Sequence, residues 1–472
     1  MKRLTLELVL ESLTGSVLAG ESPISDVAID SREVRPGTLF VALKGEQVDG
    51  HDFVAEAFER GARAAIVERD RMGAFPVVDL RRDPPAAAPP TPVALRVHNS
   101  LAALQQIARY WRSRLDVRVI GITGSVGKST TKEVAAELLE RRYRTLRNPG
   151  NLNNEIGLPL TVLQLTDVHA RAVLEMGFYV PGEIALLCDI ARPQVGVVTN
   201  IGPVHLERAG SMDAIVAGKR ELVEALPPAP EGVAILNYDD DRVRGMAAHT
   251  RARVFYYGLS PEADLWADEI DGLGLDGLRF ALPHGRDHDH VRVPMLGRHS
   301  VHTALRAAAV GLAEGLAWET ILAGLQTMRA QLRLMAVPGP GGAVILDDTY
   351  NAAPDSTIAA LNLLAELEGR RLAVLGDMLE LGSYEESGHR MVGARAAAVA
   401  DELVAVGRRA RWIAEEALRA GLPENRVAQV EDVDAAVARL RKRIGAGDIV
   451  LVKGSRGMRM DRIVDELAEG TS

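Results

Sequence analysis

The sequence predicts an α/β protein with several domains and mainly parallel sheets. The chain has 472 residues, about three times a usual domain length of ~150 residues. Hydrophobic residues make up 47%, charged residues 25% and aromatic residues 4%, which is typical of a globular protein and not of a disordered or fibrous one. Short β-branched runs alternate with helical stretches along most of the chain, the pattern of sheets covered by helices on both faces.

Charge and apolar patterning exclude several classes of protein. The formal net charge of −9 argues against general binding of nucleic acid or membrane surfaces. Glu7 and Glu11 interrupt the apolar core that a signal peptide would need, and no run of about 18 apolar residues predicts a membrane-spanning helix. The single cysteine, Cys188, excludes an internal disulfide framework, and its apolar helical surroundings indicate a packed structural thiol. We therefore expect a cytoplasmic protein.

The first predicted domain covers residues 1–92 and is a small α/β unit. GTLFVALKG is typical of a strand, and HDFVAEAFERGARAAIVE of a helix, a glycine stop and a second strand. The domain is predicted to end with RRDPPAAAPPTP, residues 81–92, because clustered prolines continue neither a helix nor a central strand. The second predicted domain covers 93–334. The third covers 335–472 and begins just before PGPGG.

Strands and helices alternate in both larger domains. VRVIGIT is a near-continuous β-branched run, and the helix predicted after it carries apolar residues at i, i+4 spacing, namely Val134 with Leu138 and Ala135 with Leu139. RAVLEMG and VGVVTNI predict further buried strands of a parallel sheet. In the third domain AVILDD, RLAVLGD, LVAVG and DIVLVKG alternate with helical stretches, which predicts a second doubly wound sheet.

The HGRDHDH cluster, residues 284–290, contains residue types that coordinate metals. Its spacing matches no known ligand template, and it lies between the strand-like runs RFALP and VRVPML. We expect a solvated hairpin loop here.

GITGSVGKST, residues 121–130, resembles a phosphate-binding loop with displaced glycines. The standard loop, G-x-x-x-x-G-K-[ST], has a glycine five positions before the second one, where this chain has isoleucine. Backbone amides at such a turn and the dipole of the following helix bind anions, and Gly124 and Gly127 let the chain approach phosphate oxygens. Lys128 would reach the β and γ phosphates and Ser129 would offer its hydroxyl to Mg²⁺, so we expect ATP binding.

Two further polar residues end predicted strands of the same sheet. Glu175 ends the strand RAVLEMG, where a buried carboxylate is costly unless it is paired or coordinates a metal, and His205 follows the next strand in the same manner. Each alone is as often structural as functional, but together they favour a site. Lys219, in contrast, has the pattern of an ordinary exposed helical lysine.

These segments together resemble the Mur ligase family of peptidoglycan synthesis. The resemblance covers essentially the whole chain and rests on TGSVGKSTTKE, NLNNEIGLPLTVL, LEMG, TNIGPVHLE, DDTYNAAPDS, VLGDMLELG, LVKGSRGMRM and the N-terminal DSREVRPGTLFVALKGEQVDGHDFV. In this family the loop is T-G-[ST]-x-G-K-[ST]-[ST], which accounts for the displaced glycines. The resemblance implies a uridine-nucleotide-binding N-terminal domain, a central P-loop ATPase-like domain and a C-terminal Rossmann-like domain.

The activity implied by the resemblance is ATP-dependent amide ligation. DDTYNAAPDS and GDMLELG are typical of the family member that joins D-alanyl-D-alanine to the terminal carboxylate of UDP-N-acetylmuramoyl-tripeptide through an acyl phosphate, giving ADP and phosphate. Two alternatives stay open. One is the ligase that adds a diamino acid to the dipeptide precursor, although its usual DNPR-type motif is absent. The other is a non-catalytic ATP-binding scaffold derived from such a ligase. The family resemblance also implies a monomer.

The resemblance assigns roles to individual residues. Those implied to bind ATP are Thr123, Gly124, Ser125, Val126, Gly127, Lys128, Ser129, Thr130, Thr303, Arg333 and Asp348. Those implied to contact the substrates are Ser31, Arg32, Asn153, Asn154, Asn351, Ser455 and Arg456, with Lys453 in the same third-domain loop. Those implied to be catalytic are Lys128, Glu175, His205 and Lys219. Two Mg²⁺ ions would be held by Ser129, Glu175, His205 and Lys219, the lysine being carbamylated.

Two departures from the family pattern affect the nucleotide site. The family's GRHNVxNA is GRHSVHTA here, so Ser300 and Thr303 replace asparagines, the second of which usually lies near the adenine. Because a hydroxyl has fewer groups than an amide with which to read a base edge, these changes put purine selectivity in question. Leu332 stands where a glycine is usual before Arg333, which predicts a different backbone shape for that loop.

Overall fold

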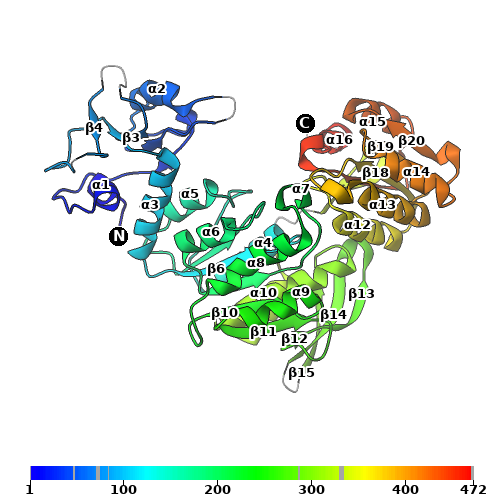
Figure 1. Ribbon diagram of the computed structural model, residues 1–472. Helices are drawn as coiled ribbons and strands as arrows, with labels where there is room; N and C mark the ends of the chain where they lie inside the picture. The colour runs from blue at the N-terminus through cyan, green and yellow to red at the C-terminus, as the bar shows by residue number, and fades with distance from the viewer. Residues whose placement is uncertain are drawn as a thin grey trace.

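The structure, a computed structural model, describes residues 2–45, 48–70, 75–82, 84–284, 287–328 and 334–468. Its elements form three units, with the first and third at the ends of a V and the central unit between them (Figure 1). Among the described helices none is long and apolar enough to span a membrane. Three of the four sheets are parallel or mainly parallel, which confirms the predicted α/β class.

The first unit is built on a five-stranded parallel sheet of order β1-β2-β3-β5-β4. Its strands are β1 (Val27–Ala28), β2 (Leu39–Val41), β3 (Ala64–Val67), β4 (Val77–Asp79) and β5 (Val93–Arg96). Its helical segments are α1 (Leu6–Thr14), η1 (Ser31–Glu33), η2 (Gly50–Phe53) and α2 (Val54–Glu59). The strand, helix and strand predicted here are therefore present as β2, α2 and β3.

The predicted boundary at residue 92 falls inside this first sheet. β5 follows the proline-rich stretch and pairs with both β3 and β4. The prolines stop regular structure only locally, and a connection between two paired strands tolerates them as well as a domain linker does. The chain leaves the first unit through α3 (Ser100–Ser113), which packs against α1 and against α5 and α6 of the central unit.

The central unit holds a seven-stranded parallel sheet of order β12-β11-β10-β9-β6-β8-β7. Its strands are β6 (Arg118–Thr123), β7 (Thr145–Arg147), β8 (Arg171–Glu175), β9 (Val195–Val198), β10 (Val233–Asn237), β11 (Arg253–Gly258) and β12 (Leu265–Trp266). The predicted strands at β6, β8 and β9 are confirmed. The sequences of these strands are nearly continuous apolar runs because helices bury both faces of the sheet.

The central unit contains several helical segments, some of which cover the two faces of this sheet. They are α4 (Lys128–Glu140), α5 (Gly157–Leu163), α6 (Glu183–Ala191), α7 (Leu206–Ala209), α8 (Met212–Glu224), α9 (Asp241–Arg244), η3 (Gly245–His249), η5 (Arg298–Ser300), α10 (Val301–Ala313) and α11 (Trp318–Gln326). α5, α6 and α8 bury one face, and α4 and α10 bury the other. Cys188 is buried on α6, as predicted, beside the sulfur of Met176 at 3.8 Å.

A small antiparallel sheet of order β13-β14-β15 packs on the α10 side of the central unit. Its elements are β13 (Asp268–Gly272), η4 (Gly274–Asp276), β14 (Leu278–His284) and β15 (Asp287–Val293). β14 and β15 pair as a hairpin, but His284 and residues 287–290 lie on its strands, so the prediction of a loop is wrong for them; residues 285–286 lie outside the described residues. His288 and His290 pair with carboxylates of β13. In the described part of the chain no group of three His, Cys, Asp or Glu side chains is placed to hold a metal.

The third unit holds a six-stranded sheet of order β16-β17-β21-β18-β19-β20, in which only β16 is antiparallel. Its strands are β16 (Met335–Pro338), β17 (Val344–Asp348), β18 (Arg370–Gly376), β19 (Glu402–Val406), β20 (Val427–Val430) and β21 (Asp448–Lys453). Its helices are η6 (Pro340–Gly342), α12 (Pro354–Glu366), η7 (Gly382–Tyr384), α13 (Glu385–Val399), α14 (Arg411–Arg419), η8 (Glu424–Arg426), α15 (Val433–Leu440), η9 (Arg456–Met458) and α16 (Asp461–Leu467). The four predicted strands are confirmed, whereas β16 and β20 are additional.

Candidate active site

A cleft of about 770 Å³ lies between the central and third units and receives the loops at the carboxyl ends of their strands. In parallel sheets this edge is where ligands bind, because neighbouring strands end there together. Many of the predicted site residues line the cleft: Ser125, Val126, Gly127, Lys128, Thr130, Asn153, Asn154, Glu175, His205, Ser300, Thr303, Asp348, Asn351, Lys453, Ser455 and Arg456.

Gly124 and Gly127 shape the turn between β6 and α4 for different reasons. Gly124 has φ +140°, and a Cβ atom on it would lie 1.8 Å from Thr199 Oγ1 and 2.9 Å from the Thr199 backbone nitrogen. Gly127 has φ +86° and precedes the first residue of α4. A side chain at Gly124 would therefore collide with the end of β9, so the loop fits against that strand only with glycine here.

The loop is further anchored to Asn200, a residue that the sequence reasoning missed. The backbone amide of Ser125 donates to the Asn200 carbonyl at 2.9 Å, and that of Val126 donates to Asn200 Oδ1 at 2.9 Å. The Thr199 hydroxyl donates to the Val126 carbonyl at 2.7 Å. These bonds hold the turn in one shape before any nucleotide is bound. Asn200 lies two residues after the end of the strand VGVV, and this place near a strand end was the available signal.

Lys128 and Lys219 share one acceptor, the carbonyl of Gly124. Lys128 Nζ donates to it at 2.7 Å, and Lys219 Nζ donates to it at 3.0 Å. The prediction of an exposed helical Lys219 is wrong, because α8 packs this side chain under the loop and leaves only 2% of the residue exposed. Burial, reinforced by the charge of Lys128, lowers the pKa of Lys219 well below its usual value. A neutral amine is thereby favoured at this position.

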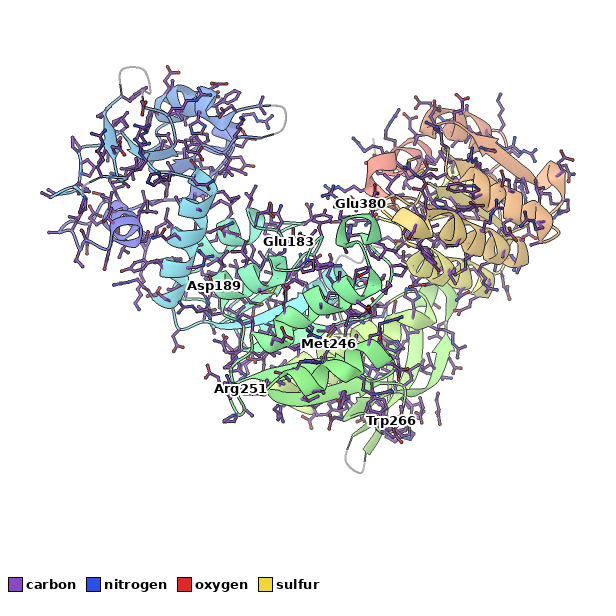
Figure 2. The ribbon with its side chains drawn as sticks, in the orientation of Figure 1. Glu183, Asp189, Met246, Arg251, Trp266 and Glu380 are labelled. Carbon is purple, nitrogen blue, oxygen red and sulfur yellow. The ribbon has the colours of Figure 1, made fainter. Side chains whose placement is uncertain are left out.

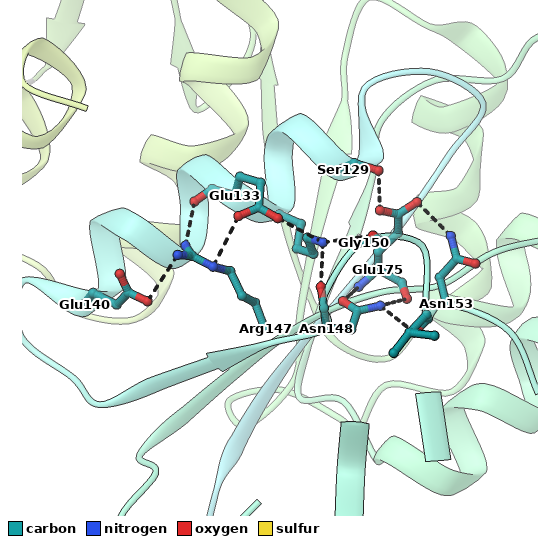
Figure 3. A network of polar contacts seen from close by, with 10 residues as sticks. Ser129, Glu133, Glu140, Arg147, Asn148, Gly150, Asn153 and Glu175 are labelled. Atoms are coloured by element: carbon teal, nitrogen blue, oxygen red, sulfur yellow. Dashed lines mark hydrogen bonds and ion pairs between the residues drawn. The ribbon is translucent and has the colours of Figure 1, made fainter. Parts of the chain in front are cut away.

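Glu175 is the centre of a hydrogen-bonded network below the loop (Figure 3). Its carboxylate accepts from the hydroxyl of Ser129 and, at 2.9 Å, from the amide of Asn153. Asn148 fixes its backbone by accepting from the Glu175 amide at 2.9 Å and donating to the Glu175 carbonyl at 3.1 Å. Lys132, buried on α4, donates to the Asn148 carbonyl at 2.6 Å. The carboxylate is therefore held in place beside the first turn of α4.

His205 lines the same cleft and contacts the third unit. Its Nδ1 atom meets a carboxylate oxygen of Glu380, and its ring lies edge-on to Tyr179 with centroids 4.7 Å apart. Burial lowers the pKa of His205, while Glu380 opposes the shift. Glu380 also lies 3.6 Å from Arg208, so one carboxylate of the third unit engages two residues of the central unit.

The third unit contributes a lysine–carboxylate pair at the ends of β17 and β21. Lys453 Nζ, which is almost fully buried, donates to Asp348 Oδ2 at 2.7 Å and to the Asn351 carbonyl at 2.8 Å. The Ser455 hydroxyl accepts from the Leu379 amide at 2.9 Å. The guanidinium of Arg456 lies 5.5 Å from the centre of the Tyr350 ring. These contacts bring the predicted third-unit residues together at the wall of the cleft opposite the phosphate loop.

The two hydroxyls that replace the family's asparagines are engaged by local partners. Ser300 Oγ donates to the Leu296 carbonyl at 2.7 Å, and Thr303 Oγ1 accepts from Arg306 at 2.8 Å. Arg306 also donates to Thr131 on α4 at 2.8 Å. The geometry therefore ties Thr303 to Arg306 and through it to the helix of the phosphate loop.

Several predicted residues lie outside this cleft. Ser31 and Arg32 are in the first unit, where Ser31 donates to Glu56 at 3.2 Å and Arg32 pairs with Asp30. Thr123 is buried at the end of β6 and donates to the Met176 carbonyl at 3.1 Å. Leu332 and Arg333 lie outside the described residues, so their position relative to the cleft is not described.

Three cleft residues were not found from the sequence. Desolvation by the cleft walls lowers the pKa of His299 to about 4, with Lys453 adding to the shift, although the residue as a whole is exposed. Burial raises the pKa of Asp355, which lies at the start of α12. Glu380 is the third. Each of these three residues lies in or beside a sequence segment that resembles the Mur ligase family. Their positions at the cleft, however, depend on how the central and third units pack together.

The donors fit a Mg²⁺ ion beside Ser129 and Glu175. A hydroxyl and a carboxylate oxygen are hard ligands, and they already touch each other next to Lys128. Because three acidic or imidazole ligands do not converge in the described residues, an ion here would complete its shell with nucleotide phosphates and water, as Mg²⁺ commonly does. The Lys219 amine is buried behind the loop, where it donates to the Gly124 carbonyl and not to the Ser129–Glu175 pair.

Three protein-family models match successive parts of the chain. They are described as "Mur ligase family, catalytic domain" over residues 23–112, "Mur ligase middle domain" over 122–311 and "Mur ligase, glutamate ligase domain" over 332–456. A Bacillus subtilis protein named UDP-N-acetylmuramoyl-tripeptide–D-alanyl-D-alanine ligase is 34% identical and aligns over 99% of each chain.

Solved structures give the same picture. A structure of MurF from Acinetobacter baumannii has a TM-score of 0.84 and 31% identity, and the match covers 100% of both chains. A structure of MurF ligase from Thermotoga maritima in complex with ADP has a TM-score of 0.80 and 27% identity, and covers 97% of both chains.

Proposed function

We propose that this chain, which belongs to the Mur ligase family, joins D-alanyl-D-alanine to the terminal carboxylate of UDP-N-acetylmuramoyl-tripeptide at the expense of ATP. The observation that carries the proposal is a cleft lined both by the phosphate loop of the central unit and by Asp348, Asn351 and Lys453 of the third unit. Support comes from relatives of that name that align over nearly the full chain.

The chemistry requires activation of a carboxylate. Direct attack of an amine on a carboxylate would have to expel oxide, so the carboxylate oxygen first takes the γ-phosphoryl group of ATP and ADP leaves. The amine then attacks the acyl carbon of this acyl phosphate, a tetrahedral intermediate forms, and phosphate departs with the electrons of the broken C–O bond. The proton lost by the amine goes to a base or to water. The products are an amide, ADP and phosphate.

The residues of the cleft suit the first step. Lys128 stands at the phosphate loop, where its ammonium would neutralise charge as the phosphoryl group moves between two anions. Asn200 holds the loop through the amides of Ser125 and Val126, so the shape of the turn would be set before ATP binds. Asp348 would contact the ribose, and Thr303 lies on the adenine side of the site by family resemblance.

Metal ligands are proposed for two Mg²⁺ ions. Ser129 and Glu175 would hold one ion, and Glu175, His205 and a carbamylated Lys219 would hold the second. Bound Mg²⁺ supplies Lewis-acid stabilisation of charge on the phosphoryl oxygens. The depressed pKa of Lys219 supports the carbamate, because only the neutral amine adds CO₂.

Each unit has a proposed task. The first, with Ser31 and Arg32, would hold the uridine nucleotide; the central unit would hold ATP, with Asn153 and Asn154 near the tripeptide carboxylate. The third, with Asn351, Ser455 and Arg456, would receive the dipeptide. Closure of the third unit over the central one would keep water from the acyl phosphate.

The test is phosphate release by the purified protein with ATP, Mg²⁺, the UDP-muramoyl tripeptide and D-alanyl-D-alanine, omitting one component at a time. We expect release only when all are present, with a pentapeptide product. Release without the dipeptide would point to another acceptor, such as a diamino acid on the dipeptide precursor. No release under any condition would favour a binding-only scaffold.

A further inference from the structure

His205 of the central unit and Glu380 of the third unit form a polar contact, although the two residues are 175 positions apart in sequence. A carboxylate only accepts hydrogen bonds, so the proton of a neutral His205 ring in this contact is on Nδ1. The lone pair for a metal is then on Nε2, for which the described residues offer no hydrogen-bond partner. Glu380 thus selects one tautomer of the imidazole and fixes the plane of its ring.

Backbone strain marks the same contact. His205 has φ +60° and Glu380 has φ +64°. Only five non-glycine residues in the described part of the chain have a positive φ, and two of them are these facing residues. Such strained conformations cluster at functional sites, where the surroundings hold them in place.

Neighbouring contacts dock the Glu380 loop onto α7 (Figure 2). The Glu207 amide points to the Glu380 carbonyl at 3.4 Å, and Arg208 lies 3.6 Å from the other carboxylate oxygen. Gly382 packs so closely that a Cβ atom would come within 3.1 Å of the Glu207 backbone nitrogen. The Glu380 carboxylate is therefore delivered to His205 only when the third unit is seated on the central one.

We propose that Glu380 is a positioning residue that orients the His205 imidazole for metal binding across the boundary between the units. A ligating histidine usually donates its second ring N–H to a carboxylate, which fixes the ring and raises its basicity. Here that carboxylate belongs to the other unit, so seating of the third unit and completion of the metal site are coupled. The inference rests on the proposed function, in which His205 binds a metal.

The test measures the binding of Mn²⁺ alone to the full chain. The EPR signal of the free ion is the readout. Glu380→Ala is expected to weaken binding about 10- to 100-fold, the usual effect of removing such a partner. Glu380→Gln keeps an oxygen that accepts from Nδ1 and should lose less. Glu385→Ala is the matched control, because Glu385 pairs with Arg409 inside the third unit and should leave binding unchanged.

Two results would overturn the inference. One is Mn²⁺ affinity of Glu380→Ala and Glu380→Gln within twofold of the unaltered protein. The other is unchanged affinity of His205→Ala, which would mean that the imidazole holds no metal. If Glu380→Ala fails to fold, the inference is tested on Glu380→Gln alone. Its Mn²⁺ affinity and the Mg²⁺ concentration that it needs for half-maximal ligation are then compared with those of the unaltered protein. The ligation assay on the unaltered protein tests the proposed function separately, since the Mn²⁺ measurement needs neither substrate.

Discussion

Replacing Gly124 with alanine is expected to lower the free energy of unfolding by about 2–6 kcal/mol. The new Cβ atom would lie 1.8 Å from Thr199 Oγ1, which can rotate away, but also 2.9 Å from the Thr199 backbone nitrogen. That nitrogen is fixed by its bond to the Thr123 carbonyl at 3.0 Å. Overpacking costs about 1–3 kcal/mol, and an L-residue at φ +140° adds about 1–3 kcal/mol of backbone strain.

The matched control for this change is Gly182→Ala. Gly182 also has a positive φ, +96°, but a Cβ atom there would meet nothing within 4 Å, so only the backbone strain of about 1–3 kcal/mol remains. Urea unfolding of both variants measures the difference, and Thr199→Ala combined with Gly124→Ala should recover only part of the loss. Equal destabilisation of the two glycine variants would refute the packing argument.

Three further predictions concern titratable side chains. Lys219→Ala should lower the ligation rate at least about 100-fold. With ¹³C-bicarbonate, only the unaltered protein should give a carbamate NMR signal. Normal turnover of the variant without added bicarbonate would refute the carbamate. Burial raises the pKa of Cys188, so a thiol reagent at pH 8 should modify it only after unfolding, and fast reaction of the native protein would contradict its packing. The pKa of His299 is about 4 in the folded state and 6.5 when unfolded, so the unfolded state binds more protons between these values and stability falls as the pH drops from 6.5 to 4. Because the residue is exposed, we expect the free energy of unfolding to fall by about 1 kcal/mol over this range and not by the full ~3 kcal/mol. The variant His299→Gln should lose less stability over the same range in a pH series of urea unfolding curves. An unchanged pH dependence in the variant would exclude His299 as the cause.

Local patterns were sufficient for the framework of the central unit. The β-branched run at β6, the glycines and Lys128 of the turn, and the i, i+4 apolar residues of α4 each describe neighbours in sequence, so the strand, loop and helix were predictable. The strand end at Glu175 was predictable for the same reason, whereas His205 lies seven residues after β9, immediately before α7. Cys188 was placed correctly because its apolar surroundings are local as well.

Other features depend on packing between distant segments. The local pattern around Lys219 indicates a surface lysine, and only the family resemblance gave it a role. In the structure α8 is buried against Phe178, whose ring a Cβ on Gly218 would approach to 1.9 Å. A glycine in the middle of a helix was the available signal of this close approach. The pairing of β5 with the first sheet and the contact of Glu380 with His205 had no local signal, because both follow from how separate segments meet.

The most direct test of the central claim uses UDP-muramoyl tripeptide labelled with ¹⁸O in its terminal carboxylate. Activation as an acyl phosphate transfers one carboxylate oxygen to the γ-phosphorus, and attack by the dipeptide amine breaks the bond between that oxygen and the acyl carbon. We predict one ¹⁸O in each phosphate released, together with a pentapeptide that retains the other label. Unlabelled phosphate accompanying the same product would contradict the mechanism.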